Sequence, residues 1–211
     1  MDFRERPGGR PAMLKGKDMR FRTFLIGTIL AAAVCAPAAA DTLETAMTRL
    51  AETELKLWIR HPTIVDAIRA QNIRSRTLTL DEILALDRQW RAETISVSKP
   101  MIQALMANAL SSFLTQKKRT GDGLYTEIFV MDNKGLNVGQ SDVTSDYWQG
   151  DEEMWQKTFL VGRDAIHVGA IRRDKSTRVL QSQLTLPVPD PVTGTVIGAI
   201  TFGIDVSRLA R

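Results

Sequence analysis

Cysteine and histidine are almost missing from this sequence of 211 residues, which holds one cysteine and two histidines. The histidines, His61 and His167, are too far apart for a zinc or metalloprotease motif, so a transition-metal site would need scattered carboxylates. No Gly-x-Ser-x-Gly elbow and no phosphate-binding glycine loop occurs either. These absences argue against metal, thiol and nucleotide chemistry, and we expect neither a cofactor, a metal nor an enzyme activity. A hydrolase that uses one histidine and an unplaced serine is the least favoured hypothesis.

A hydrophobic run long enough to cross a membrane is also lacking. The most apolar run, from Phe24 to Val34, has about 11 residues, whereas a membrane span needs about 20. Arg20 and Arg22 precede this run, and the small residues 38–40 follow it. A basic segment, a short apolar segment and a small-residue cleavage site, in that order, are typical of a secretory signal peptide.

We therefore predict a signal peptide over residues 1–40, cleaved between Ala40 and Asp41. The true start is Met1, Met13 or Met19. The mature protein is then periplasmic. The alternative is a protein held in the inner membrane by an uncleaved N-terminal anchor.

An excess of one charge is missing from the predicted mature chain. Residues 1–40 contain seven of the 28 basic and three of the 24 acidic side chains, which leaves 21 of each in residues 41–211. The formal charge of +4 therefore belongs to the predicted signal peptide. A neutral domain has no electrostatic footprint for nucleic acid, and we expect no nucleic-acid partner. Since Cys35 also leaves with the signal, disulfide chemistry is excluded.

Apolar residues at three- and four-residue spacing predict helices in the first half of the mature chain. Thr79 and Glu82 form a capping box, which marks a helix start, and Pro62 marks a break after His61. Gly121-Asp122-Gly123 ends the helical part. The predicted helices cover Thr42–His61, Pro62–Asn72, residues 80–93 and Pro100–Gln116.

The pattern changes to alternating and β-rich residues from Tyr125 onward. The turns are Asp132–Gly135, Asp174–Thr177 and Asp190–Gly194. The segment Val196–Ile204 is apolar on both faces, which places it in the centre of the sheet. The predicted strands are Tyr125–Met131, Leu136–Gln140, Ala165–Arg172, Arg178–Val188 and Thr195–Val206, with a helix over Gly150–Leu160 between the second and the third.

This order predicts an α+β domain over residues 41–211, in which long N-terminal helices pack on a five-stranded antiparallel sheet. Residue-level motifs lie in Glu127–Asp132 with Gly135, in Ser145–Glu152 with Trp155, and in Leu186–Val188, Thr193-Gly194, Ile197–Ile200 and Gly203–Asp205. In these motifs the sequence resembles the single Cache family of PAS-like periplasmic sensor domains. The resemblance covers roughly residues 42–207. It implies a small ligand between the sheet and the 145–155 segment. Cache domains usually lie between two membrane helices, whereas this sequence stops at Arg211, so we expect a separate membrane-bound receptor or kinase to carry the signal.

Aromatic residues are scarce, at 6% of the chain, yet three of them gather within nine positions: Tyr147, Trp148 and Trp155. Acidic and amide side chains lie between them. Aromatic rings beside a few oriented polar groups suit a small-ligand pocket, and Asp151 next to Trp148 suits a cationic ligand. The alternative is that the two tryptophans pack a helix on the sheet while Asp151 caps that helix.

Alternation along the later strands adds further ligand-contact candidates. His167 lies on one strand, and Gln181 and Gln183 share one face of the next, while Leu180, Leu184 and Leu186 point to the core. These polar residues either converge on the ligand or form the solvated side of the sheet. Tyr125 and Arg172 are weaker candidates.

Three classes of function remain, and the least favoured of them is the periplasmic hydrolase named above. The first is a stand-alone periplasmic sensor that binds a small molecule and passes the signal to a membrane partner, with the Thr42–His61 helix as the output or homodimerisation element. The second is a periplasmic protein-interaction module that binds no small ligand.

Overall fold

The computed structural model describes residues 36–173 and 178–209. Most of the predicted signal peptide and the predicted turn Asp174–Thr177 lie outside these ranges. Among the described residues, no helix is both long and apolar enough to cross a membrane.

The first helix is longer than predicted. It runs without a break through α1 (Ala36–Leu50), a π-helical turn η1 (Ala51–Leu55) and α2 (Lys56–Trp58). It thus begins ahead of the predicted cleavage point, which stays a prediction. The helix is amphipathic as expected, because Met47, Ala51 and Leu55 recur every four residues and are fully buried.

The next two helices begin where local sequence signals place them. Helix α3 (Pro62–Ser75) has proline at its first position, and the Nδ1 of His61 accepts a hydrogen bond from the Thr63 amide. Helix α4 (Leu80–Thr94) has the complete capping box of Thr79 and Glu82. Both starts are confirmed, and α3 continues three residues beyond the predicted end.

The predicted helix Pro100–Gln116 is wrong as a single element. The structure has α5 (Pro100–Met106) and α6 (Ala109–Thr120), separated by Ala107 and Asn108. The Asn108 side chain accepts from the Ser111 amide and donates to the carbonyl of Val138, so it caps α6 and joins it to the sheet.

The sheet is antiparallel, in the order β2-β1-β6-β5-β3, with β4 also paired to β5. Its strands are β1 (Tyr125–Met131), β2 (Asn137–Gln140), β3 (His167–Val168), β4 (Arg172–Arg173), β5 (Leu180–Pro189) and β6 (Val196–Asp205). Strand β6 lies in the centre, as its two apolar faces predicted. A short helix, α8 (Val206–Leu209), follows it.

The predicted strand Ala165–Arg172 lies at an edge of the sheet and is divided into β3 and β4. His167 pairs with Thr185 and Arg172 pairs with Gln181. The edge strand therefore advances by five residues between these two pairs, while β5 advances by four. The extra residue is a bulge at 169–171, where the Ser182 hydroxyl donates to the carbonyl of Gly169. The expected five-stranded antiparallel sheet is therefore confirmed, with one edge strand in two pieces.

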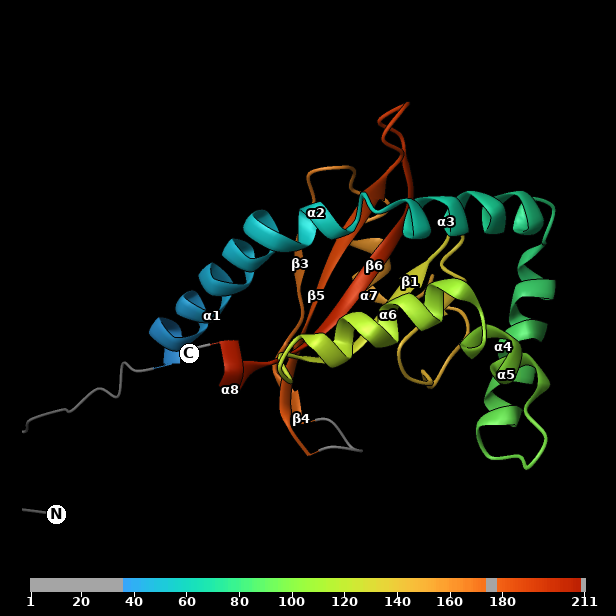
Figure 1. Cartoon of the computed structure of the whole chain (residues 1–211), viewed down its shortest axis with the longest axis horizontal. Helices are drawn as coiled ribbons and strands as arrows, with labels where there is room; N and C mark the ends of the chain where they lie inside the picture. Colours follow the sequence, from blue (N-terminus) through green and yellow to red (C-terminus); the bar gives the residue numbers. More distant parts are fainter. Residues whose placement is uncertain (1–35, 174–177, 210–211) are drawn as a thin grey trace, which may run out of the picture. The chain divides into compact units, whose positions relative to one another are not determined.

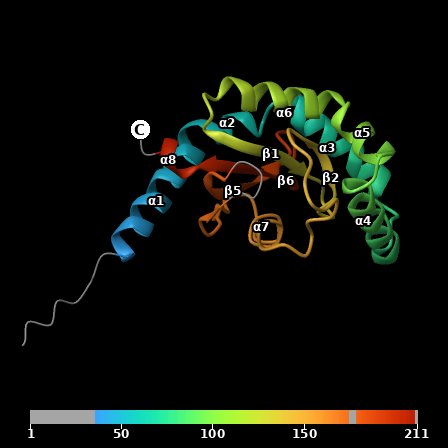
Figure 2. The ribbon, with the colours of Figure 1, turned by 90° about the horizontal axis from the view of Figure 1, so that it is seen from below.

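The two faces of the sheet are covered by different parts of the chain (Figures 1 and 2). Helices α2, α3 and α6 cover one face, and the short helix α7 (Glu153–Gln156) lies on the other. Alternate residues of β1 divide accordingly: Ile128 and Val130 belong to the large core under the helices, and Phe129 packs with Trp155 on the α7 side. Helices α4 and α5 extend past the β2 edge (Figure 2).

The predicted helix Gly150–Leu160 is shortened to the four residues of α7. Residues 150–152 form a turn and a bend instead, directly after the segment in which Leu136 bridges to Trp148 and the Gln149 amide donates to the carbonyl of Gly135. A side chain at position 150 would meet the Trp148 ring at 2.7 Å, so glycine permits this close approach.

Candidate ligand-binding pocket

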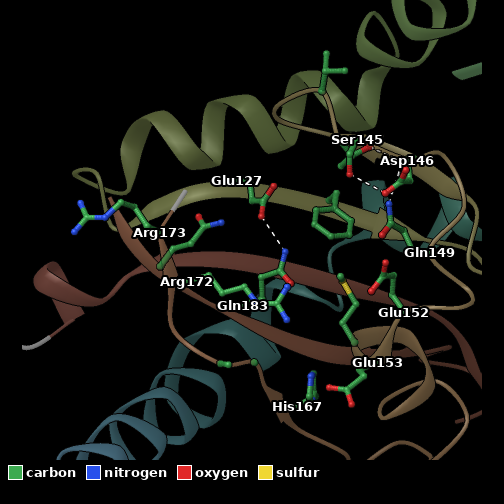
Figure 3. Close-up of a pocket in the computed structure, with 17 residues that line it drawn as sticks. Glu127, Ser145, Asp146, Gln149, Glu152, Glu153, His167, Arg172, Arg173 and Gln183 are labelled. Carbon is green, nitrogen blue, oxygen red and sulfur yellow. Dashed lines mark hydrogen bonds between the residues drawn. The ribbon is translucent and has the colours of Figure 1, made fainter. Parts of the chain in front are cut away.

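A pocket of about 640 Å³ lies on the α7 side of the sheet. Its floor is formed by Glu127 and Phe129 of β1 and by Gln181 and Gln183 of β5, and its walls come from residues 143–154 and 167–173 (Figure 3). This volume is in the range of small-molecule sites in proteins.

The polar floor depends on a glycine in the central strand. Glu127 and Gln183 both pair with Gly203, one from each side. Because Gly203 has no side chain, the Gln183 amide reaches across and donates to Glu127 Oε1 at 3.0 Å (Figure 3). A Cβ at position 203 would come within 2.7 Å of the Glu127 Cγ. A second link, from the Thr126 hydroxyl to Gln181 Oε1, lies beside it.

The wall segment 144–149 is fastened to helix α4. The buried Asp87 carboxylate accepts hydrogen bonds from the amides of Tyr147 at 2.9 Å and Trp148 at 3.1 Å. The Trp90 indole donates to the carbonyl of Thr144 at 2.9 Å. Three hydrogen bonds thus connect the backbone of this wall to side chains of α4.

Arg91 forms ion pairs both with the carboxylate on α4 and with a carboxylate of the pocket wall. It forms an ion pair with Asp87 at 2.7 Å and with Asp146 at 3.0 Å. Since Asp146 lines the pocket, one guanidinium connects a pocket carboxylate with the carboxylate that anchors the wall.

Charged side chains are separated along the pocket (Figure 3). Asp146 and Glu152 lie at one end, and Arg172 and Arg173 lie at the other. The site is thus dipolar rather than uniformly acidic or basic.

His167 lies near Glu153 on one side of the pocket (Figure 3). Partial burial lowers the pKa of the His167 imidazole, and Lys157 lowers it further, while Glu153 opposes the shift. The pKa of Glu153 is itself lowered, chiefly by its hydrogen bond with Lys157. The imidazole therefore favours its neutral form, which can both donate and accept a hydrogen bond.

Three of the seven predicted contact residues line this pocket: His167, Gln181 and Gln183. Tyr147 and Trp148 do not. The Tyr147 ring stacks on Trp90 with centroids 5.6 Å apart, and the Trp148 indole donates to the carbonyl of Lys134 at 2.8 Å. Both pack between the α4–α5 hairpin and Leu136.

Trp155 and Asp151 are also outside the lining. Trp155 stacks on Phe159 and its indole donates to the carbonyl of Asp132, which is the packing alternative raised from the sequence. Asp151 is exposed, one residue before the Glu152 N-cap of α7, so it does not cap that helix. The weaker candidate Tyr125 is buried under the helices, where its hydroxyl donates to Glu54 at 3.0 Å.

The sequence reasoning missed Glu127, Asp146 and Arg173 as lining residues. Glu127 had a readable signal, since it is a charged residue on the same strand face as Phe129 in an otherwise apolar strand. The other two had no comparable signal. Among residues 36–173 and 178–209, no cluster of His, Cys, Asp and Glu could hold a metal ion.

The sequence matches no protein-family model and no curated protein. Among solved structures, the chain is similar to the ligand-binding domain of the Campylobacter jejuni chemoreceptor Tlp3, with 13% identity, 82% of this chain and 62% of that chain covered, and a TM-score of 0.38. It is also similar to the sensor domain of the V. cholerae histidine kinase DctB (11% identity, 82% and 58% covered, TM-score 0.35) and to the E. coli DcuS sensor domain (20% identity, 62% and 90% covered, TM-score 0.35). The chain thus spans less than two thirds of the Tlp3 and DctB domains.

These matched structures are sensory domains of chemoreceptors and kinases, the class of protein that the Cache resemblance indicated. Because their identities and TM-scores are low, we base the function of this chain on its own pocket.

Proposed function

We propose that this chain is a ligand-binding sensor domain of the bacterial envelope, and that its ligand occupies the pocket between the sheet and residues 143–154. The observation that carries this proposal is the fastening of one pocket wall to α4 through Asp87 and Trp90. A ligand that contacts this wall acts at the same time on the helical part of the domain. A binding pocket with such a connection suits sensing better than catalysis.

The two histidines also favour binding over catalysis. His61 caps α3, stacks on Phe113 with ring centroids 4.5 Å apart, and does not line the pocket. His167 alone lines the pocket.

The proposed export and output follow from the N-terminal part of the chain. A signal peptide cleaved between Ala40 and Asp41, or an uncleaved anchor, places the domain in the periplasm. The helix α1–α2 packs on the large core through Met47 and Leu55, so a change in that core alters its position. A membrane-bound receptor or kinase, or a second copy of the chain, reads that helix.

Native mass spectrometry of protein purified from the periplasm tests the binding proposal. We expect a co-purified ligand to add mass to the parent protein. The added mass should be absent from Gln183→Ala, because this substitution removes the amide on the pocket floor. The matched control is Gln103→Ala, an exposed glutamine of α5, which retains the mass. A ligand that is kept equally by both variants would place binding elsewhere.

A protein-interaction module without a small ligand is the second candidate, favoured by one observation. Ile95 and Val97, between α4 and α5, are almost completely exposed. If they form a partner surface, a crosslinked envelope partner is captured by the parent chain and not by Ile95→Ser with Val97→Ser.

A further inference from the structure

The length of the pocket follows from the register of its strands. His167 pairs with Thr185 and Arg172 pairs with Gln181, four residues away on β5. At about 3.3 Å per residue, these two levels are about 13 Å apart. The Arg172 end of the pocket lies at the Gln181 level.

The acidic end of the pocket lies near the His167–Thr185 pair. Phe129 and Thr185 both pair with Thr201 of β6, and Phe129 also pairs with Gln140, so these residues lie at the same height in the sheet. The Thr144 hydroxyl hydrogen-bonds Gln140 Oε1 at 3.2 Å, which fixes the Thr144–Asp146 wall above this level. A ligand that contacts both charged ends is therefore elongated.

The basic end offers free hydrogen-bond donors. Both arginines are exposed, and in the described part of the chain the Arg172 guanidinium has no hydrogen bond or ion pair. Arg173 uses one nitrogen to donate to the carbonyl of Arg178. A guanidinium binds a carboxylate through two parallel hydrogen bonds. An anionic group of the ligand fits here.

The acidic end offers acceptors for a cation. Asp146 accepts from Ser145 and pairs with Arg91, while Glu152 is exposed and has no ion pair with any residue that the structure describes. A primary ammonium group has three donors, which a carboxylate and a nearby carbonyl can accept.

The middle of the pocket is lined by amide groups. Gln183 uses its nitrogen toward Glu127, and Gln181 uses its oxygen toward Thr126. Among the described residues, the Gln183 oxygen and the Gln181 nitrogen take part in no hydrogen bond, so they remain available. The bulge also places two consecutive residues, Gly169 and Ala170, on the wall. One free acceptor and one free donor side by side match a peptide bond.

Building on the proposed function, we propose that the ligand is a short linear peptide of three or four residues with free termini. Its ammonium terminus lies at the Asp146–Glu152 end and its carboxylate at the Arg172–Arg173 end (Figure 3). Extended chains cover about 3.3–3.6 Å per residue, so three residues span about 10–11 Å and four span about 13–14 Å, which brackets the pocket length. A single α-amino acid carries both charges on one carbon and cannot reach both ends.

Thermal unfolding of the purified chain with defined probes tests this inference. The probes are alanine, Ala-Xaa-Ala tripeptides with each side chain at the middle position, and the best tripeptide with its N-terminus acetylated or its C-terminus amidated. We expect a tripeptide to raise the Tm, alanine to leave it unchanged, and each blocked terminus to weaken binding by about tenfold or more.

Pocket variants assign each terminus to its end. Arg172→Ala with Arg173→Ala is expected to remove the preference for the free carboxylate, and Glu152→Gln the preference for the free ammonium. The control Arg88→Ala changes an exposed arginine of α4 outside the pocket lining and retains both preferences. If the double variant at Arg172 and Arg173 binds the peptide as tightly as the parent and keeps the preference for a free carboxylate, the inference is overturned.

The remaining outcomes separate this inference from the proposed function. If a single amino acid or an uncharged metabolite binds instead, and Gln183→Ala abolishes that binding, the peptide inference is wrong and the sensor proposal stands. If neither the probes nor a periplasmic extract adds mass or raises the Tm, both are overturned.

Discussion

Replacing Asp87 with alanine tests whether one buried carboxylate holds the pocket wall on α4. Its Oδ1 accepts two backbone hydrogen bonds, and its Oδ2 accepts from Arg91 at 2.7 Å, while the side chain is only 7% exposed. Truncation leaves the amides of Tyr147 and Trp148 without their acceptor, at about 1–3 kcal/mol for each unsatisfied buried group. We expect the free energy of unfolding to fall by about 3–5 kcal/mol, from the two unsatisfied amides together.

Two matched variants separate the backbone anchor from the ion pair. Asp87→Asn keeps one oxygen for the two amides and loses the charge, so we expect a loss of about 1–2 kcal/mol. Arg91→Ala removes the ion pair but leaves the anchor. Because the Arg91 side chain is 57% exposed, its loss should stay below about 1 kcal/mol.

Equilibrium unfolding in urea measures all three variants. With an m value of about 2 kcal/mol/M, Asp87→Ala shifts the midpoint down by about 1.5–2.5 M, and Arg91→Ala by less than about 0.5 M. Equal shifts for Asp87→Ala and Arg91→Ala would mean that the ion pair, rather than the bonds to the backbone, stabilises the wall. A midpoint within about 0.5 M of the parent for Asp87→Ala would refute the anchor itself.

Three further predictions concern packing and pH. Trp148→Ala should lower the free energy of unfolding by about 2–3 kcal/mol, because a half-buried indole and its hydrogen bond are lost; a loss below about 1 kcal/mol would contradict its packing role. Gly198→Ala should lower the free energy of unfolding in urea by about 1–3 kcal/mol, because the new Cβ would collide with the Met131 carbonyl. Gly169→Ala should lower it clearly less, since a Cβ there would lie 3.4 Å from the nearest atom, the carbonyl oxygen of Gln183. Because burial lowers the pKa of His167, the unfolded chain binds a proton at higher pH than the folded chain does. The stability that neutral His167 contributes is therefore fully present above about pH 6.5 and decreases as the pH falls below it. His167→Asn should flatten this part of the plot of unfolding free energy against pH, and an unchanged slope would refute the assignment.

Local signals in the sequence were reliable where a few neighbouring residues decide the conformation. The capping box at Thr79, the proline start at Pro62 and the turn before Leu136 all occur where predicted. Helices were predicted too long where a distant partner competes, as at Asn108, which bonds to the carbonyl of Val138 thirty residues away. Local propensity carries no information about such a partner.

The candidate site was predictable in part for the same reason. Alternation along a strand assigned Gln181 and Gln183 to one face, and the pocket lies on that face. The aromatic residues Tyr147 and Trp148 were placed in the pocket because they cluster in sequence, yet the bridge from Leu136 to Trp148 turns this segment toward α4 instead. Clustering in sequence shows which residues are near each other, and not which way a loop faces.

The sequence by itself determined the α+β class, the central position of the last strand and the neutral charge of the predicted mature domain. These properties depend on composition and on short-range periodicity, which are complete in the linear chain. Only the tertiary structure decided which polar residues meet. Glu127 and Gln183 come together across Gly203, and Asp146 and Arg172 lie at opposite ends of one pocket, because strand pairing sets distances between residues that are dozens of positions apart.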